Sequence, residues 1–417
     1  MSKKCIIAVM YSLLTAASAN TQTLTVDSCY AFAVRNYPLI KQYDLIEKSK
    51  EYTLSNAGKA YLPQVSITAI EGYVFGGLPS IGPLAGNESN FKFIGIAQLN
   101  QTIWDGGATK TQKNIITASS EVDKATIEVS FNDLRTRVNE LFFGILLVDE
   151  QLKQLEIQDT LLNSNINRIK LLNQNGLAYK TDVDEIRVEQ LKLSQQRKEL
   201  KYVRNGYLTM LSVLIGVKIG DQAILQKPPM INLLTDNQIL RPELGLYKRQ
   251  RDLLNAQAGL RKVNLMPKIG FLGAGVMLAP GIGIGNGSIS SLGVAGLSAS
   301  WNIGGLYKNS NEKELTKLSL NKVNVQEEVF LFNTRFHMTQ SSVNIQKQQA
   351  ILDDDGEIMA LRKTIREGYQ FKYDSGVGTL HDLLNAITKE GEASAQKALH
   401  ETQLLKTMYE YKTTGGN

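Results

Sequence analysis

The sequence predicts an α+β fold in which pairs of membrane-length strands alternate with very long helices, and in which this order occurs twice. Residues 175–183 recur as residues 375–383, glycine on glycine and aspartate on aspartate. Prolines at 38 and 63 have the same separation, twenty-five residues, as prolines at 242 and 267. A long proline-free stretch precedes each copy of the repeated turn. A chain with such a repeat can form one body from two similar halves, so we expect an internal duplication.

The N-terminus, residues 1–19, has the pattern of a secretory signal peptide. Lys3 and Lys4 precede an apolar run over 5–14, and small residues end the segment. A membrane-spanning helix needs about 20 apolar residues, and neither this run nor any later segment supplies them. We therefore expect an exported protein that begins near Asn20. If the mature chain crosses a membrane, it does so with strands.

Charge and cysteine content narrow the function further. The chain has 46 basic and 40 acidic residues, a mixed surface rather than the basic footprint of a nucleic-acid-binding protein. Cys5 lies in the predicted signal, so Cys29 is left alone and no intrachain disulfide is expected. Residues 26–28 lack the small apolar context of a bacterial lipid-anchor site. We therefore expect no lipidation.

Each half begins with a helical stretch that gives way to strands after a proline. The first stretch covers residues 24–59, with Asp27 as its expected N-cap. The period then changes to two, as where Val65 and Ile67 alternate with Ser66 and Thr68. Each run has room for the about 9–11 residues of a tilted membrane strand, and we expect its polar face to line a lumen. The predicted strand pairs cover 64–104 and 268–303.

Each strand pair ends in a glycine pair, which allows the chain to bend sharply into the following helix. The four predicted bend residues are Gly106, Gly107, Gly304 and Gly305.

A helix of unusual length follows each bend. Residues 107–175 and 306–374 contain no proline, and about 68 residues at 1.5 Å each reach on the order of 100 Å. Apolar residues recur at spacings of four and three in both stretches, as in a coiled coil. Thr339 and Gln346 interrupt the second seam. With return helices over 183–214 and 383–411, the predicted organisation is a first repeat over 20–216, a connector over 217–241, a second repeat over 242–412 and a tail over 413–417.

Four strands per chain cannot close a membrane barrel. The smallest such barrels have about eight strands, and an open edge leaves backbone groups unpaired in hydrocarbon. Two chains would give eight strands and a lumen filled by side chains, whereas three chains would give twelve and an opening. We therefore expect a homotrimer.

Taken together, these features resemble the TolC family of outer-membrane efflux proteins, over essentially the whole mature chain. The resemblance rests on the repeated order of helix, strand pair, long helix, tight turn and return helix, and on exits of the type found at residues 104–107. It implies a trimeric channel-tunnel, with a twelve-stranded β-barrel in the outer membrane of a Gram-negative bacterium and a periplasmic α-helical barrel. The implied function is the exit duct of a tripartite efflux or type I secretion system.

The resemblance also implies partners and site residues. The partners are a periplasmic adaptor (membrane fusion) protein and an inner-membrane pump of the RND, ABC or MFS type. The implied adaptor-docking tips are Gly176, Leu177, Gly376, Val377, Gly378 and Thr379. The implied periplasmic aperture comprises Asp182, Asp382, Asn385 and His381. Asn385 stands where the family often has a second acidic residue, and Gly378 where it has a basic residue that holds the gate.

Several residues have a second interpretation. Asp182 and Asp382 are also suited to the first turn of a helix, and both roles can hold together. The glycine-rich segment 281–287 lacks the following helix of a phosphate loop, so we expect a surface loop. Residues 353–355 are three aspartates without calcium-loop spacing, and we expect a solvated helix face. Among three scattered histidines, protonation of His381 would couple the aperture to pH.

Two other function classes compete with a channel. An enzyme is disfavoured, because we find no nucleophile, paired-carboxylate or metal-ligand pattern; we expect no catalytic residues, no cofactor and no metal site. The alternative to a channel is a periplasmic coiled-coil scaffold or adaptor without its own pore. Such a protein would have a small barrel segment between its helices, whereas here the helices flank two strand pairs.

Overall fold

The computed structural model of the protein describes residues 23–73, 75, 91–231, 238–280 and 289–416. The predicted signal peptide and the glycine-rich segment 281–287 lie outside these ranges. The chain divides into two compact units, which we call the strand unit (Lys41–Ile127 and Glu243–Phe330) and the tip unit (Met1–Ile40, Glu128–Pro242 and Leu331–Asn417). Within the described ranges, no helix has both the length and the apolar character needed to span a membrane.

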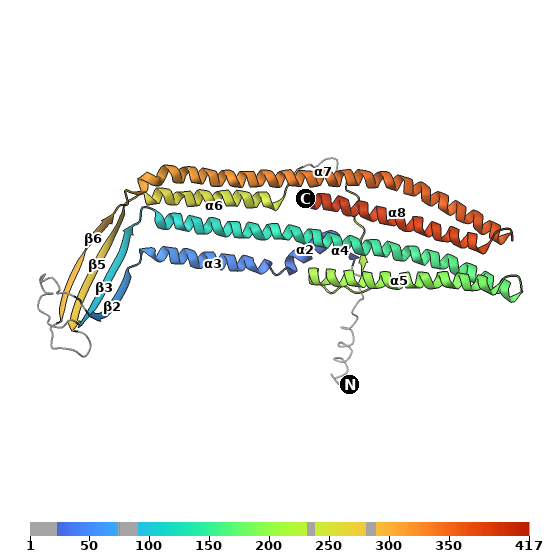
Figure 1. Ribbon diagram of the computed structural model, residues 1–417, viewed down its shortest axis with the longest axis horizontal. Helices are drawn as coiled ribbons and strands as arrows, with labels where there is room; N and C mark the ends of the chain where they lie inside the picture. The colour runs from blue at the N-terminus through green and yellow to red at the C-terminus, as the bar shows by residue number, and fades with distance from the viewer. Residues whose placement is uncertain (1–22, 74, 76–90, 232–237, 281–288, 417) are drawn as a thin grey trace, which may run out of the picture. The chain divides into compact units, whose positions relative to one another are not determined.

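The strand unit contains one four-stranded antiparallel sheet in the order β2-β3-β5-β6 (Figure 1). The strands are β2 (Gln64–Tyr73), β3 (Phe91–Trp104), β5 (Lys268–Pro280) and β6 (Ser290–Ser300). They lie within the two predicted ranges. Because β2 and β6 stand at the ends of this order, each has one described neighbour and one edge without a described partner.

The last strand is shorter than predicted. We expected it to reach Ile303, but β6 ends at Ser300. The indole N–H of Trp301 donates to the carbonyl oxygen of Leu265 at 3.0 Å, and the carbonyl oxygen of Asn302 accepts from the N–H of Gly305 at 3.3 Å. These bonds turn the chain toward the next helix before the strand can continue.

The two faces of the sheet differ in polarity. Val65 pairs with Leu99 on one face, and Ser66 pairs with Gln98 on the other. The polar face also carries Thr102, but it changes character farther from the helices, where Ile70 pairs with Ile94. The predicted polar face is therefore polar next to the helices and is interrupted by apolar residues before the pair of Gly72 with Lys92.

At the exit of β3, one carboxylate organises the bend. Asp105 is buried and accepts hydrogen bonds from the hydroxyl of Tyr61 at 2.9 Å, the N–H of Gly107 at 2.8 Å and the N–H of Thr109 at 2.6 Å. Burial alone would raise the pKa of Asp105, but bonds from the side chain and backbone of Thr109, from Tyr61 and from Gly107 lower it to about 2. The carboxylate is therefore charged and caps the helix that follows.

The four predicted bend glycines are not equivalent. Gly106 and Gly107 have φ angles of 67° and 90°, in the left-handed region that favours glycine. Gly304 and Gly305 are not among the glycines with positive φ. The first bend therefore requires glycine backbone freedom, and the second is made without it.

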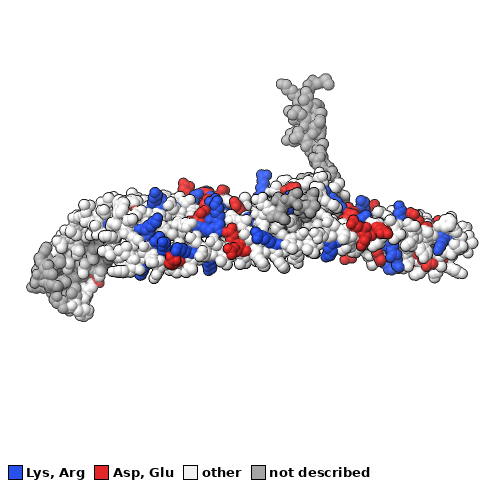
Figure 2. Space-filling model, turned by 90° about the horizontal axis from the view of Figure 1, so that it is seen from above, with Lys and Arg blue, Asp and Glu red and all other residues white. Residues whose placement is uncertain are grey.

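Long helices make up most of both units. The strand unit holds α3 (Ile40–Gly58), the short η1 (Lys59–Tyr61), α6 (Pro242–Asn264) and the first parts of α4 (Ala108–Gln174) and α7 (Gly305–Asp374). The tip unit holds α2 (Val26–Asn36), α5 (Lys180–Ile215), α8 (Leu380–Gly415) and the remaining parts of α4 and α7. Basic and acidic side chains are interspersed over the helices on the face shown in Figure 2.

The main core of the tip unit joins the N-terminal segment to both helical hairpins. Phe142 and Phe143 of α4 pack with Leu211 of α5 and Leu405 of α8, all almost fully buried. Cys29 of α2 belongs to the same core, and burial raises the pKa of its thiol to about 11. The thiol is therefore protonated at neutral pH.

Three details of this unit differ from the prediction. Thr25, not Asp27, is the N-cap of α2, in a capping box with Ser28. The predicted connector contains β4 (Ile224–Leu225), which pairs in parallel with β1 (Thr23–Leu24). Residues 413–415 of the predicted tail belong to α8, where the buried hydroxyl of Thr413 accepts from the side-chain amide of Asn139 at 3.1 Å.

The aspartate run 353–355 also differs from the expected solvated face. Asp353 and Asp354 are exposed, but Asp355 is buried and lies 2.6 Å from Nδ1 of His400 on α8. Two residues along a helix correspond to a rotation of about 200°, so Asp355 faces the opposite way from Asp353. It therefore contacts the return helix instead of solvent.

We predict that Gly106→Ala destabilises the first bend by about 1–3 kcal/mol. The new Cβ atom would occupy a strained backbone conformation and lie 2.6 Å from Cβ of Met266. Gly304→Ala is the matched control, because its Cβ would meet only the movable side-chain oxygen of Asn302, at 3.2 Å. Thermal unfolding of the two purified variants should show a lower midpoint for Gly106→Ala, and equal midpoints would contradict the proposed role of this glycine.

Candidate functional site

The two repeated turns, at the ends of the α4–α5 and α7–α8 hairpins, lie on one shared apolar core. Ile169 and Ile186 come from the first hairpin, Leu383 and Ile387 from the second, and all four are at most 3% exposed. Because this core crosses from one hairpin to the other, it holds the two turns of one chain together.

Both turns have the same backbone design. Gly176 and Gly376 have φ angles of 74° and 76°, and each ends the preceding helix. The N–H of Leu177 bonds to the carbonyl oxygen of Leu172 at 2.8 Å, and the N–H of Val377 bonds to that of Lys372 at 3.0 Å. This is the hydrogen-bond pattern of a Schellman helix end, which needs a left-handed residue. The predicted tip glycines are therefore required by geometry.

The residues that follow these glycines project apolar surface. Leu177 is 74% exposed and Val377 is 80% exposed, and Tyr179 is equally open at the first tip. An exposed apolar side chain at a turn has no packing role within the chain. Such residues are therefore available to contact a partner.

The remaining two predicted tip residues have local roles. A Cβ atom at Gly378 would lie 3.0 Å from both Cβ of Lys372 and N of Tyr373, so this position has no room for a basic side chain. The hydroxyl of Thr379 accepts from the N–H of Asp382 at 3.1 Å and caps α8. The gate-holding residue that the family resemblance implies at Gly378 is thus absent.

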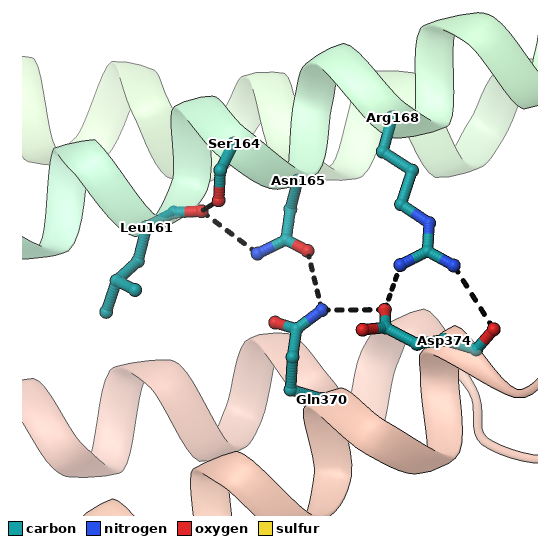
Figure 3. A network of polar contacts seen from close by, with 6 residues as sticks. All are labelled: Leu161, Ser164, Asn165, Arg168, Gln370 and Asp374. Atoms are coloured by element: carbon teal, nitrogen blue, oxygen red, sulfur yellow. Dashed lines mark hydrogen bonds and ion pairs between the residues drawn. The ribbon is translucent and has the colours of Figure 1, made fainter.

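A polar network next to the tips joins α4 to α7 (Figure 3). The guanidinium of Arg168 forms an ion pair with the carboxylate of Asp374 and donates to its carbonyl oxygen at 3.2 Å. The side-chain amide of Gln370 donates to the same carboxylate at 2.9 Å and to Oδ1 of the buried Asn165 at 3.3 Å. This link was not predicted from the sequence, because the link joins residues 206 positions apart.

A second polar contact joins the return helices. Nδ1 of His381, at the start of α8, lies 3.2 Å from a carboxylate oxygen of Glu185 on α5. Both side chains are exposed, at 77% and 42%. Protonation of His381 would therefore add charge attraction between the two hairpins at their tips, screened by solvent.

Of the two predicted aperture aspartates, Asp182 caps its helix and Asp382 binds the N-cap residue of its helix. The carboxylate of Asp182 accepts from the N–H of Tyr179 at 3.0 Å. That of Asp382 accepts from the hydroxyl of Thr379 at 2.6 Å. Asp382 and Asn385 are both exposed and one turn apart, opposite the buried Leu383. The capping role is present, and a role in an aperture stays a prediction.

The described residues offer no arrangement for metal chemistry. Within the ranges that the structure describes, no group of three or more His, Cys, Asp and Glu side chains could hold a metal ion. The pair of His400 with Asp355 has no third ligand-type residue beside it.

No protein-family model and no curated protein sequence matches the chain. Solved structures do match it over nearly its whole length. The outer membrane protein VceC from Vibrio cholerae aligns with a TM-score of 0.68 at 12% identity, over 94% of this chain and 96% of that one. The CmeC outer membrane channel of Campylobacter jejuni aligns with a TM-score of 0.64 at 16% identity, over 94% and 85%.

The MtrE outer membrane channel of Neisseria gonorrhoeae, in its open state, aligns with a TM-score of 0.62 at 12% identity, over 94% of this chain and 88% of that one. Identities this low establish the fold and not the activity. The TM-scores and the coverage of 94% show that the chain has the fold of the TolC-like outer-membrane channel proteins.

Proposed function

We propose that this protein is the outer-membrane exit duct of a tripartite efflux or type I secretion system, built from three copies of the chain. The observation that carries the proposal is the match of 94% of the chain to outer-membrane channels, in a fold whose sheet has two outer edges without a described partner. On this proposal the chain is exported by its signal peptide and is not an enzyme. It needs no cofactor and does not bind nucleic acid.

The sheet supports an assembly of several copies. In lipid, every backbone N–H and C=O must be paired, and a sheet satisfies this only by closing on itself. Pairing β6 of one copy with β2 of the next closes a barrel, and three copies give twelve strands. The outer edges of the described sheet are thus the surfaces that copies share.

The helices offer a second surface between copies. In the tip unit, Phe332 and Phe336 of α7 are 70% and 61% exposed and one helical turn apart, with Val343 two turns farther on. In the strand unit, Val325 and Val329 continue the same spacing and are also exposed. A heptad seam left open in one copy is what a neighbouring helix would cover. Exposed apolar residues of α5, among them Tyr202 and Val213, are candidates for that neighbour.

The tips support a partner-binding end. Leu177 and Val377 present apolar side chains at two turns held by one core. We assign these tips to the adaptor, which in turn would recruit an inner-membrane pump of the RND, ABC or MFS type. Asp182, Asp382, Asn385 and His381 would surround the periplasmic aperture, with exported drugs or proteins as cargo.

The docking role predicts a loss of export when the tips become charged. Leu177→Asp combined with Val377→Asp should abolish export of a toxic substrate, because an adaptor would have to desolvate two carboxylates. These residues are better targets than Gly176 and Gly376, whose positive φ would add backbone strain to any substitution. Gln174→Glu with Ser375→Glu is the control, since it adds the same charge at exposed positions of the same tips. Normal export by the first pair, with trimers intact, would rule out docking there.

The assembly role predicts a loss of trimers when the seam of α7 becomes charged. Phe332→Glu with Phe336→Glu should convert trimers into monomers, because two buried carboxylates would face an apolar neighbour. Asn333→Glu, at an exposed position on another side of the helix, should leave trimers intact. Light scattering of the purified protein in detergent measures the mass. Trimers of the double variant would show that this seam is not an interface between copies.

The aperture role predicts that the link between hairpins limits conductance. Arg168→Ala should raise single-channel conductance in planar lipid films while changing the free energy of unfolding by less than about 1 kcal/mol, because the ion pair is 39% exposed on both sides. Lys192→Ala is the control, since it removes a lysine whose partner, Glu189, lies on the same helix. Equal conductance in both variants would exclude a role of Arg168 in the aperture.

A further inference from the structure

A cavity of about 650 Å³ opens in the strand unit where α6 ends, β5 begins, β6 ends and α7 begins. Its charged lining consists of three basic side chains and one acidic side chain, which are Arg261, Lys268, Lys308 and Glu312. Trp301 and Asn302 form part of the remaining wall. The cavity therefore carries an excess of positive charge.

In the described part of the chain, none of the three basic side chains of this cavity forms an ion pair with a carboxylate. Nη1 of Arg261 donates to Oδ1 of Asn309 at 2.7 Å, which fixes the guanidinium, but its Nε atom is buried without a hydrogen-bond partner. Among the described residues, no carboxylate forms an ion pair with Lys268 or Lys308. A buried donor without an acceptor is unfavourable, so a ligand that accepts from it would be favoured.

The N-terminus of α7 adds to the positive potential. Gly304 and Gly305 line the cavity, and the 70-residue helix that starts there has no acidic residue in its first turn. The first N–H groups of a helix and its macrodipole attract anions. Together with the three cations, this terminus favours a ligand with several acceptor oxygens.

The first half of the chain shows how such a terminus can be satisfied. There, Asp105 accepts from the N–H groups of Gly107 and Thr109 at the start of α4. When residues 102–107 are aligned with 300–305, the position of Asp105 corresponds to Ile303, which has no acceptor. The prolines at 63 and 267 likewise align Lys268 with Gln64. The second junction thus lacks the internal carboxylate and gains a cation.

We propose that this cavity binds an external oxyanion, a phosphate or carboxylate group, that takes the place of the carboxylate present at the first junction. Lys268 pairs with Ser300 and shares its sheet face with Thr102, on the polar face. In the function proposed above, which this inference deepens, that face lines the duct. A soluble anion is therefore the favoured source of the group, and the headgroup of an anionic phospholipid is the other source.

Binding of inorganic phosphate to the detergent-solubilised full-length protein, measured by isothermal titration calorimetry, tests the proposal. Lys268→Gln and Lys308→Gln should each weaken binding about tenfold, the effect of losing one charge-assisted hydrogen bond. Lys268→Gln installs the residue found at the first junction, so folding should be preserved. Lys110→Gln, which changes the counterpart of Lys308 in the first half, should leave phosphate affinity unchanged.

Lipid retention separates the two sources. Native mass spectrometry after incubation with phosphatidylglycerol or phosphatidylcholine would support the lipid source if phosphatidylglycerol alone is retained and is lost in both lysine variants. Equal binding of phosphate and of both lipids by the wild type and the variants would overturn the proposal. These measurements do not require export, so the two proposals can fail separately. If the protein conducts ions but its anion binding does not depend on Lys268 and Lys308, the proposed binding site is wrong and the duct function stands. If the protein binds phosphate but forms no channel, the duct function is wrong and the binding site stands.

Discussion

In the proposed outer-membrane channel, the constraint on which the architecture depends is the need to pair every backbone N–H and C=O of a strand in lipid. A sheet of four strands in the order β2-β3-β5-β6 leaves the outer edges of β2 and β6 without described partners. Other copies of the same chain can supply the missing strands without any additional protein. The open apolar seam of α7 fits the same requirement, because Phe332 and Phe336 are 70% and 61% exposed. Strand edges and helix seam therefore both favour self-assembly.

The two halves share an order of elements but have diverged in chemistry. The first strand-to-helix junction is internally satisfied, with the carboxylate of Asp105 held by Tyr61 and by the start of α4. The second has Ile303 at that position and basic side chains around the start of α7. The first bend uses glycines with positive φ, and the second does not. In a homotrimer each difference would occur three times, so divergence between halves would give alternating properties around the duct.

Local patterns in the sequence predicted the repeated features well. The glycines at 176 and 376 could be recognised because a left-handed residue ends a helix, and the strand pairs because their period differs from that of helices. Features that depend on distant contacts were not predictable. The pairing of β1 with β4 involves two residues on each side, too few for a pattern. Asp355 was misjudged because its burial depends on α8 and the position of His400.

The tips illustrate the same limit. Asp182, Asp382 and His381 were predicted as aperture residues from their position in a turn. In the structure, each makes a short-range or surface contact. The contact of Arg168 with Asp374 was not predicted. The phase of two helices of 67 and 70 residues determines whether these side chains face one another, and small changes in helical twist accumulate over such a length. The relative rotation of the two helices can be seen only in the three-dimensional structure.

The relative strength of the contacts between hairpins suggests how an aperture would change size. The ion pair of Arg168 with Asp374 is solvent-exposed and is worth about 0–1 kcal/mol, whereas each fully buried side chain of the shared core contributes about 1.5–3 kcal/mol. Ile186 and Leu383 are completely buried in that core, and they belong to different hairpins. Separating the hairpins of one chain would expose them and many neighbours. In the proposed trimer, the shared core would therefore keep the two hairpins of one copy together, and the weaker polar link of Arg168 with Asp374 would open first when the aperture widens.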